Sequence, residues 1–163
     1  MKRRCTLTLI STAFVWLWIA FPVSNAVAQS AADVEGVKEA SKNLYAALAV
    51  LDNGEAMEKV WAHTPYVTYV GPRHTSVLVG WDAQEKYWPE ANALFTQREG
   101  SATLSDQHIH VNGNLAWEMG QETGEQKMKD GRSPKLDYLV TNVYEKIEGK
   151  WLMVSHHVQP KPQ

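Results

Sequence analysis

The chain has 163 residues, of which 44% are hydrophobic and 21% are charged, and its formal net charge is −2. A chain of this length can bury a real core as one domain, and the sequence contains no internal repeat and no low-complexity tract. The slightly acidic balance argues against nucleic acid as a partner, because nucleic-acid recognition depends on a basic surface.

The N-terminal segment is typical of a secretory signal peptide. Basic residues at positions 2–4 precede an apolar run from Ala13 to Phe21, and Ala26-Val27-Ala28 offers the small residues of a cleavage site. We therefore expect residues 1–28 to be removed and residues 29–163 to form one exported domain, periplasmic or secreted, with no membrane contact. The alternative is an anchoring helix, but the run is short for ~30 Å of hydrocarbon.

Cleavage would change the chemistry of the chain in two ways. Cys5, the only cysteine, leaves with the segment, so the domain has no disulfide and no thiol nucleophile. The segment carries basic residues at positions 2, 3 and 4 and no acidic residue, so the net charge moves from −2 to −5.

Two helices are predicted at the start of the domain. In the first, an apolar-rich stripe recurs at alternating steps of three and four residues, and Asp33 places a carboxylate near its N-terminus. The stripe comprises Val34, Val37, Ser41, Leu44, Leu48 and Leu51. Asp52-Asn53-Gly54 ends this helix, and residues 55–62 indicate a second, short helix that ends near Trp61.

A strand and a third helix follow. Residues 66–70 indicate a strand closed by Gly71-Pro72, after which comes a polar loop. Asp82 is predicted to cap a helix that runs to about Phe95, and Pro89 is predicted to kink it. Three aromatic residues of this helix lie seven apart on one side, namely Trp81, Trp88 and Phe95.

Two hairpins are predicted in the last part of the chain. Asn112-Gly113 joins residues 105–111 to residues 114–121, with Val111 opposite Asn114, and Glu148-Gly149 joins two alternating runs within residues 135–160. With Ile147 opposite Lys150, Thr141 would face His156. Helices, one strand, a helix and a four-stranded meander together indicate an α+β domain with its helices on one side of a curved antiparallel sheet.

This order of elements resembles the SnoaL-like branch of the nuclear transport factor 2-like superfamily, which shares its cone-shaped fold with ketosteroid isomerase. The resembling stretches are residues 44–48 before Asp52-Asn53-Gly54, Gly80-Trp81-Asp82, residues 111–117 and residues 149–154. The resemblance implies a cystatin-like α+β cone with three helices packed on the concave face, a pocket between sheet and helices, and often a dimer. It does not imply one activity, because one fold hosts many functions.

The same resemblance argues against steroid isomerase activity. Those enzymes use a tyrosine on the first helix, a carboxylate base and a protonated acid on a late strand. Tyr45 matches the tyrosine, but Tyr69 stands at the place of the base and Thr141 at the place of the acid. A tyrosine with a pKa near ~10 is a poor general base at neutral pH.

The register that the resemblance suggests defines a predicted pocket. Its candidate catalytic residues are Tyr45, Tyr69, Glu118 and His156. Its remaining wall would comprise Gln107, Ile109, Ala116, Leu139, Thr141, Val143 and Val154. A mostly apolar cavity with a few polar groups is the usual make-up of a small-molecule site. The alternative is a hydrogen-bonded core histidine and a carboxylate at the wet rim.

No metal site and no cofactor are predicted. His108-x-His110 and His156-His157 together invite a zinc proposal. In a meander, however, the first and fourth strands lie about three spacings of ~4.8 Å apart, so His108 and His157 cannot share one ion. The sequence has no phosphate-cradling loop, nucleophile elbow or dinucleotide fingerprint.

Two function classes remain open. The first, which we favour because the isomerase base and acid are replaced, is a non-catalytic dimeric module that binds a small hydrophobic molecule or a partner protein. The second is a cofactor-independent isomerase, hydratase or cyclase that uses acid–base chemistry in the same pocket. The homodimer would form through the outer sheet face, whose large groups would be His108, His110, Trp117, Tyr138, Tyr144, Trp151 and Met153. Alternatively, the extended segment from Glu122 to Lys135 folds back over these residues, or the register is slipped by one and they are core.

Overall fold

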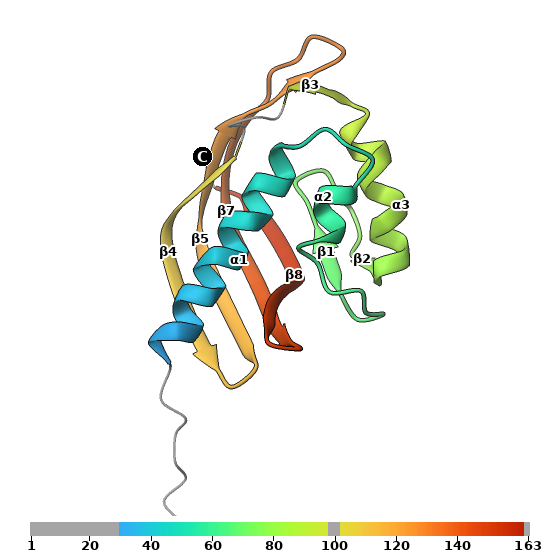
Figure 1. Cartoon of the computed structure of the whole chain (residues 1–163). Coiled ribbons are helices and arrows are strands. Elements are labelled where there is room, and N and C mark those ends of the chain that lie inside the picture. The colour runs from blue at the N-terminus through green and yellow to red at the C-terminus, as the bar shows by residue number, and fades with distance from the viewer. Residues whose placement is uncertain (1–29, 98–101, 162–163) are drawn as a thin grey trace, which may run out of the picture.

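The computed structural model describes residues 30–97 and 102–161, so the predicted signal peptide lies outside the described residues (Figure 1). The helices are α1 (Ala31–Ala49), α2 (Glu55–Glu58) and α3 (Trp81–Asn92). The strands are β1 (Thr68–Val70), β2 (Leu78–Val79), β3 (Phe95–Gln97), β4 (Thr103–Asn112), β5 (Leu115–Glu125), β6 (Lys127–Met128), β7 (Lys135–Ile147) and β8 (Lys150–Pro160). No helix in this part of the chain is both long and apolar enough to cross a membrane.

Six strands form one curved sheet in the order β2-β1-β8-β7-β5-β4, while β3 and β6 pair separately. Neighbours in the large sheet run antiparallel, apart from β1 and β8, which are parallel. The sheet is therefore mixed, where the sequence indicated a purely antiparallel one. Figure 1 shows α1 lying across the concave face of the sheet, with α2 and α3 beside β1 and β2. The domain is thus α+β, with the helices gathered on the concave side of an open sheet.

Helix α1 buries the stripe that its sequence predicted. The Ser30 hydroxyl accepts a hydrogen bond from the Asp33 amide at 3.3 Å, which caps the N-terminus. The buried members of the stripe are Val37, Ser41, Leu44 and Leu48. Leu51 is exposed instead, because the helix ends at Ala49 and the chain becomes extended at Val50.

The chain after α2 does not form the longer helix that was predicted. The helix ends at Glu58, and Trp61 is buried in a bridge to Met153 of β8. The Met153 amide donates to the Val60 carbonyl at 2.9 Å, and the Ala62 amide donates to the Met153 carbonyl at 2.9 Å. Pairing with β8 needs an extended backbone, so it replaces the last helical turn.

Helix α3 differs from its prediction at both ends. Gly80, at φ 87°, occupies the N-cap in place of Asp82, which lies in the first turn. The left-handed backbone at this position favours glycine. The helix ends at Asn92, and Phe95 begins β3 instead of extending the helix. Pro89 lies inside the helix.

The β4–β5 hairpin turns one residue later than predicted. Its two-residue turn is Gly113-Asn114, and Val111 pairs with Ala116. The register therefore differs by two residues from the predicted pairing of Val111 with Asn114. Because side chains alternate with a period of two, the inward face of both strands is unchanged. Ala116 and Glu118 are accordingly buried on the side of the helices.

The β7–β8 hairpin has the predicted turn, since Ile147 pairs with Lys150. Further along, Val154 is an extra residue between the Val143–Ser155 and Tyr144–Met153 pairs. An extra residue of this kind reverses the alternation of side chains along one strand. In β8, odd-numbered residues therefore face the helices before the bulge and even-numbered residues face them after it.

The bulge corrects the predicted pairing. Thr141 pairs with His157, and Asn142 pairs with His156. His156 faces the helices as predicted, whereas Thr141 faces the outer side of the sheet. Four residues predicted on the outer face lie on the inner side, namely Tyr138, half-buried, and the buried Tyr144, Trp151 and Met153. For this half of the sheet the alternative, a register slipped by one, is right.

Candidate functional site

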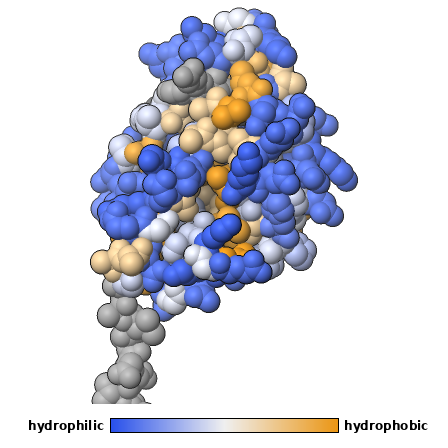
Figure 2. Space-filling model, in the orientation of Figure 1, coloured by the Kyte–Doolittle hydropathy of each residue, from blue (hydrophilic) through white to orange (hydrophobic). Residues whose placement is uncertain are grey.

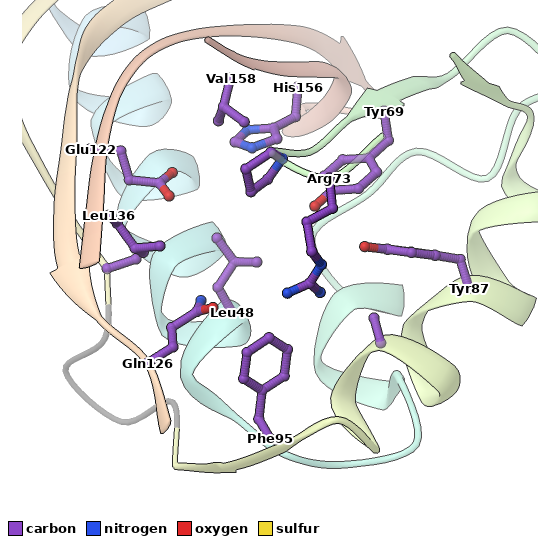
Figure 3. Close-up of a pocket in the computed structure, with 13 residues that line it drawn as sticks. Leu48, Tyr69, Arg73, Tyr87, Phe95, Glu122, Gln126, Leu136, His156 and Val158 are labelled. Atoms are coloured by element: carbon purple, nitrogen blue, oxygen red, sulfur yellow. The ribbon is translucent and has the colours of Figure 1, made fainter. Parts of the chain in front are cut away.

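A small cavity lies between the concave face of β7 and β8, the loop after β1, and helices α1 and α3 (Figure 3). Its volume is about 40 Å³. Its polar lining is Tyr69, Arg73, Tyr87, Glu122, Gln126 and His156, and its apolar lining is Leu48, Pro72, Ala91, Phe95, Ala102, Leu136 and Val158. Figure 2 shows apolar surface gathered between hydrophilic flanks on the side of the molecule drawn in Figure 1. We call this space the His156 cavity.

His156 lies in the cavity wall with 4% of its surface exposed. Its Nδ1 atom is 2.7 Å from the Oδ1 atom of Asn142, and its ring stacks on Tyr69 with centroids 5.4 Å apart. Burial, and secondarily the neighbouring His157, lowers the pKa of His156 from 6.5 to about 3. The imidazole is therefore neutral at physiological pH.

A buried carboxylate fixes the orientation of this imidazole. Glu118 is fully buried and accepts hydrogen bonds from the Asn142 amide at 2.8 Å and the Tyr144 hydroxyl at 3.0 Å. The Ser41 hydroxyl at 2.9 Å and the Gln107 amide at 2.8 Å complete its shell.

This shell determines which ring nitrogen carries the proton. Because the Asn142 nitrogen donates to Glu118, the Asn142 oxygen faces His156 and accepts from Nδ1–H. In a neutral imidazole the other nitrogen, Nε2, then carries a lone pair. His156 can therefore offer a hydrogen-bond acceptor to a molecule in the cavity.

A second carboxylate, Glu122, also lines the cavity, and the sequence analysis missed it. The Tyr45 hydroxyl donates to it at 3.3 Å, and burial together with the Glu122 charge raises the pKa of Tyr45 far above its usual range. Tyr45 is therefore a permanent donor. The alternation that placed Glu118 inward also places Glu122 inward, four residues further along β5.

Aromatic rings form the wall opposite Glu122. Tyr69 of β1 is buried and contacts Tyr87 and Trp88 of α3 at centroid distances of 5.4 and 4.9 Å. The close approach requires Gly71, because a Cβ atom there would overlap the Tyr69 hydroxyl. The loop after β1 then brings Arg73 over the Phe95 ring, with 5.3 Å between the guanidinium carbon and the ring centre.

Of the four predicted catalytic residues, Tyr69 and His156 line the cavity. Glu118 lies behind the cavity wall and is connected to His156 through Asn142, and Tyr45 is hydrogen-bonded to Glu122 in the wall. The structure thus brings all four into one connected region. Gln107 belongs to the same region through its bond to Glu118, although it does not line the cavity.

The remaining residues of the predicted wall lie elsewhere. Ile109 and Ala116 face the helices but pack in the core. Leu139 and Thr141 lie on the outer face, where they border a hollow of about 250 Å³. Val143 pairs with the outward-facing Trp117, and Val154 is the buried bulge residue. The alternation along β7 decides this outcome, because it buries Asn142 and Tyr144 instead.

The outer-face hollow contains both His108 and His157. The two residues lie in one row across the sheet, separated by Met119 of β5 and Thr141 of β7. Two intervening strands agree with the spacing argument against a shared ion. Within residues 30–97 and 102–161, no group of three or more His, Cys, Asp or Glu side chains is placed to hold a metal.

A curved open sheet, helices on its concave face and a cavity between them define the cone-shaped nuclear transport factor 2-like class. Solved structures support this class at the level of the fold. A Salmonella enterica protein of the NTF2-like superfamily is 18% identical, with 82% of this chain and 95% of that chain covered and a TM-score of 0.70. A Streptomyces avermitilis protein described as a putative dehydratase from the NTF2-like family is 22% identical, with coverages of 81% and 98% and a TM-score of 0.69.

The chain belongs to the SnoaL-like domain family, whose model matches residues 37–159. A Nostoc punctiforme protein of unknown function with a cystatin-like fold is 18% identical, with coverages of 83% and 96% and a TM-score of 0.65. The comparison with curated proteins gave no match.

Proposed function

We propose that the protein binds a small molecule in the His156 cavity without transforming it. The observation that carries this proposal is the fixed orientation of His156, whose Nε2 lone pair is available to the cavity because Asn142 holds Nδ1–H. A general base works best with a pKa near the working pH, and the pKa of about 3 makes His156 a weak base. As a neutral acceptor, in contrast, it needs no proton transfer.

The dimensions of the cavity favour a compact ligand. A volume of about 40 Å³ is more than the ~10–15 Å³ that one water needs. Apolar side chains such as Leu48, Phe95 and Val158 make up part of the wall. A small molecule with an apolar body and one hydrogen-bond donor would satisfy both kinds of surface.

The test is recovery of a bound molecule. Purified protein is incubated with a lipid and metabolite extract, and what stays bound is identified by mass spectrometry. We expect His156→Leu to lose the ligand that the wild type retains. His157→Leu is the matched control, because His157 is the next residue, exposed on the opposite face.

Equal ligand occupancy in folded His156→Leu and wild type would overturn the proposal. If His156→Leu does not fold, His156→Gln keeps a polar side chain at this position and provides the same comparison. A protein that retains no molecule from any extract also counts against a binding function.

A second candidate is cofactor-independent acid–base chemistry in the same cavity. It is favoured by Glu122, a carboxylate that is 6% exposed, lines the cavity and is bonded by the Tyr45 donor. A carboxylate in the cavity wall, hydrogen-bonded by a phenol behind it, can move a proton in an isomerisation, hydration or cyclisation. Mass spectrometry of a recovered ligand after incubation decides between the candidates, because a catalyst changes the structure of the ligand and a binding module leaves the ligand unchanged.

The proposal includes export and a homodimer. Cleavage after Ala28 would deliver the domain to the periplasm or the medium. The dimer would use the outer sheet face, where Leu115, Trp117, Met119 and Leu139 are exposed. Exposed apolar residues that are adjacent on one face favour association.

A further inference from the structure

Arg73 brings a guanidinium to the wall of the His156 cavity. It is exposed in the loop between β1 and β2, and its guanidinium lies over the Phe95 ring. Figure 3 shows its guanidinium pointing into the space between Tyr69, Tyr87 and Phe95. Among the described residues, no carboxylate forms a salt bridge with it, whereas Arg132 is paired with Asp130 at 2.7 Å.

Arg73 also lies at the outer boundary of the cavity. A neighbouring hollow of about 320 Å³ shares Arg73, Tyr87 and Ala91 with the His156 cavity, so these residues stand between the two spaces. Arg73 is exposed, whereas His156 is buried. A molecule in the cavity would therefore meet a fixed positive charge at its outer end and a neutral acceptor at its buried end.

We propose that the cavity selects small carboxylic acids that carry a hydroxyl group, with Arg73 binding the carboxylate and His156 Nε2 accepting the hydroxyl hydrogen. This inference rests on the proposed binding function and names the class of its ligand. A guanidinium fork matches the two oxygens of a carboxylate through parallel N–H bonds. The lone pair of a neutral imidazole requires a donor, which a hydroxyl supplies and a second carboxylate does not.

A competing explanation involves Glu122, whose carboxylate lines the same cavity. In that case Arg73 would only offset the Glu122 charge, and the free energy of unfolding, but not the choice of ligand, would depend on Arg73. The Glu90 carboxylate beside the neighbouring hollow adds to the negative charges near Arg73. The two explanations differ in what they predict for an uncharged analogue of the ligand.

The experiment is calorimetric titration of the purified protein with matched probes. Lactate and 3-hydroxybutyrate carry both groups, propionate and butyrate lack the hydroxyl, and lactamide and 3-hydroxybutyramide lack the charge. We expect a hydroxy acid to bind at least about tenfold more tightly than its amide, as the loss of a charge-assisted hydrogen bond implies. Arg73→Met should remove this difference, and Arg73→Lys should keep part of it. Arg132→Met is the control, because Arg132 lies outside the cavity lining.

Several results would overturn the inference while leaving the binding function open to the extract experiment. They are amides that bind as tightly as the acids, acids that bind Arg73→Met at wild-type affinity, or a wild type that binds neither hydroxy acid. If Arg73→Met lowers the stability, Glu122→Gln restores it, and ligand preference is unchanged, then charge balance is the role of Arg73. Loss of all binding in His156→Leu, by contrast, is the result that the binding function predicts, and it does not test the role of Arg73.

Discussion

The Nδ1 atom of His156 and the Oδ1 atom of Asn142 are 2.7 Å apart, and this bond connects the cavity to the buried carboxylate of Glu118. Ser41 of α1 donates to the same carboxylate, so one series of hydrogen bonds runs from the cavity to the first helix. Networks of this kind hold a side chain in one orientation when every member is satisfied.

The first prediction concerns pH. The pKa of His156 is about 3 in the folded protein against 6.5 for an exposed histidine. Between these values the unfolded chain binds a proton on His156 that the folded protein does not. The free energy of unfolding is therefore unaffected by the titration of His156 above about pH 6.5, and it declines as the pH falls below that value, by up to about 1.4 kcal/mol per pH unit. Urea unfolding between about pH 7.5 and 5 measures this slope, above the range where most carboxylates titrate.

His156→Leu should flatten the slope, and His157→Leu should retain it. Equal slopes for the wild type and His156→Leu would mean that the folded protein accepts the proton on His156, which contradicts its burial.

The second prediction concerns Glu118. Glu118→Gln replaces one acceptor oxygen by a donor facing other donors, so we expect a loss of about 1–3 kcal/mol in the free energy of unfolding. Tyr144→Phe removes one donor and leaves the carboxylate with three, so its cost should be lower, about 1 kcal/mol. Urea denaturation compares the two. A larger loss in Tyr144→Phe would place the main stabilising role on the tyrosine.

The third prediction concerns the dimer. We expect sedimentation at micromolar concentration to give a dimer mass for the wild type and a monomer mass for Trp117→Glu, because symmetry would place two like charges near each other. Trp117 is 39% exposed and contacts His110 at 4.3 Å, so its replacement should leave the fold intact. Val77→Glu is the control, because Val77 is exposed in the loop before β2, at the opposite edge of the sheet from β4. A monomeric wild type would contradict the dimer.

Trp151→Glu should behave differently from Trp117→Glu. Trp151 is buried, and its ring lies 2.7 Å from where a Cβ atom of Gly36 would be. A charge there should unfold the protein rather than separate two folded subunits.

The fourth prediction concerns Gly71. A methyl group at this position would overlap the Tyr69 hydroxyl, so Gly71→Ala should cost about 1–3 kcal/mol and displace the ring that stacks on His156. In a Tyr69→Leu background the extra cost of Gly71→Ala should disappear, which a double-mutant cycle measures by thermal unfolding. Additive costs would show that another contact limits this position.

The elements that depend on local patterns could be predicted from the sequence. The α1 stripe follows from helical periodicity, and the inward position of Glu118 follows from alternation along β5, which a register error of two residues does not disturb. His156 was also predicted on the inner face, but together with Thr141; it faces the helices beside Asn142 because the bulge at Val154 reverses the alternation along β8. The fold class was also predictable, because the order of elements is itself a sequence property.

The rest depends on contacts that no local pattern contains. The bulge at Val154 depends on which side of β7 is buried. The side of Leu139 and Val143 looks equally apolar in the sequence of β7, but the structure buries the side of Asn142 and Tyr144. Arg73 reaches the cavity through a loop whose path depends on packing of Tyr69 against α3. Glu122 could have been found, because it continues the inward series of β5.

The extra residue Val154 also separates β8 into a part that packs in the core and a part that lines the cavity. Before it, Trp151 and Met153 lie among the core residues; after it, His156 and Val158 lie in the cavity wall. Substitutions before the bulge should therefore act through the packing of the core, whereas substitutions after it should change the shape and polarity of the cavity wall. If the cavity binds a molecule as proposed, a lineage of this domain could change that ligand by altering positions 156 and 158 alone, without repacking Trp151 and Met153 in the core.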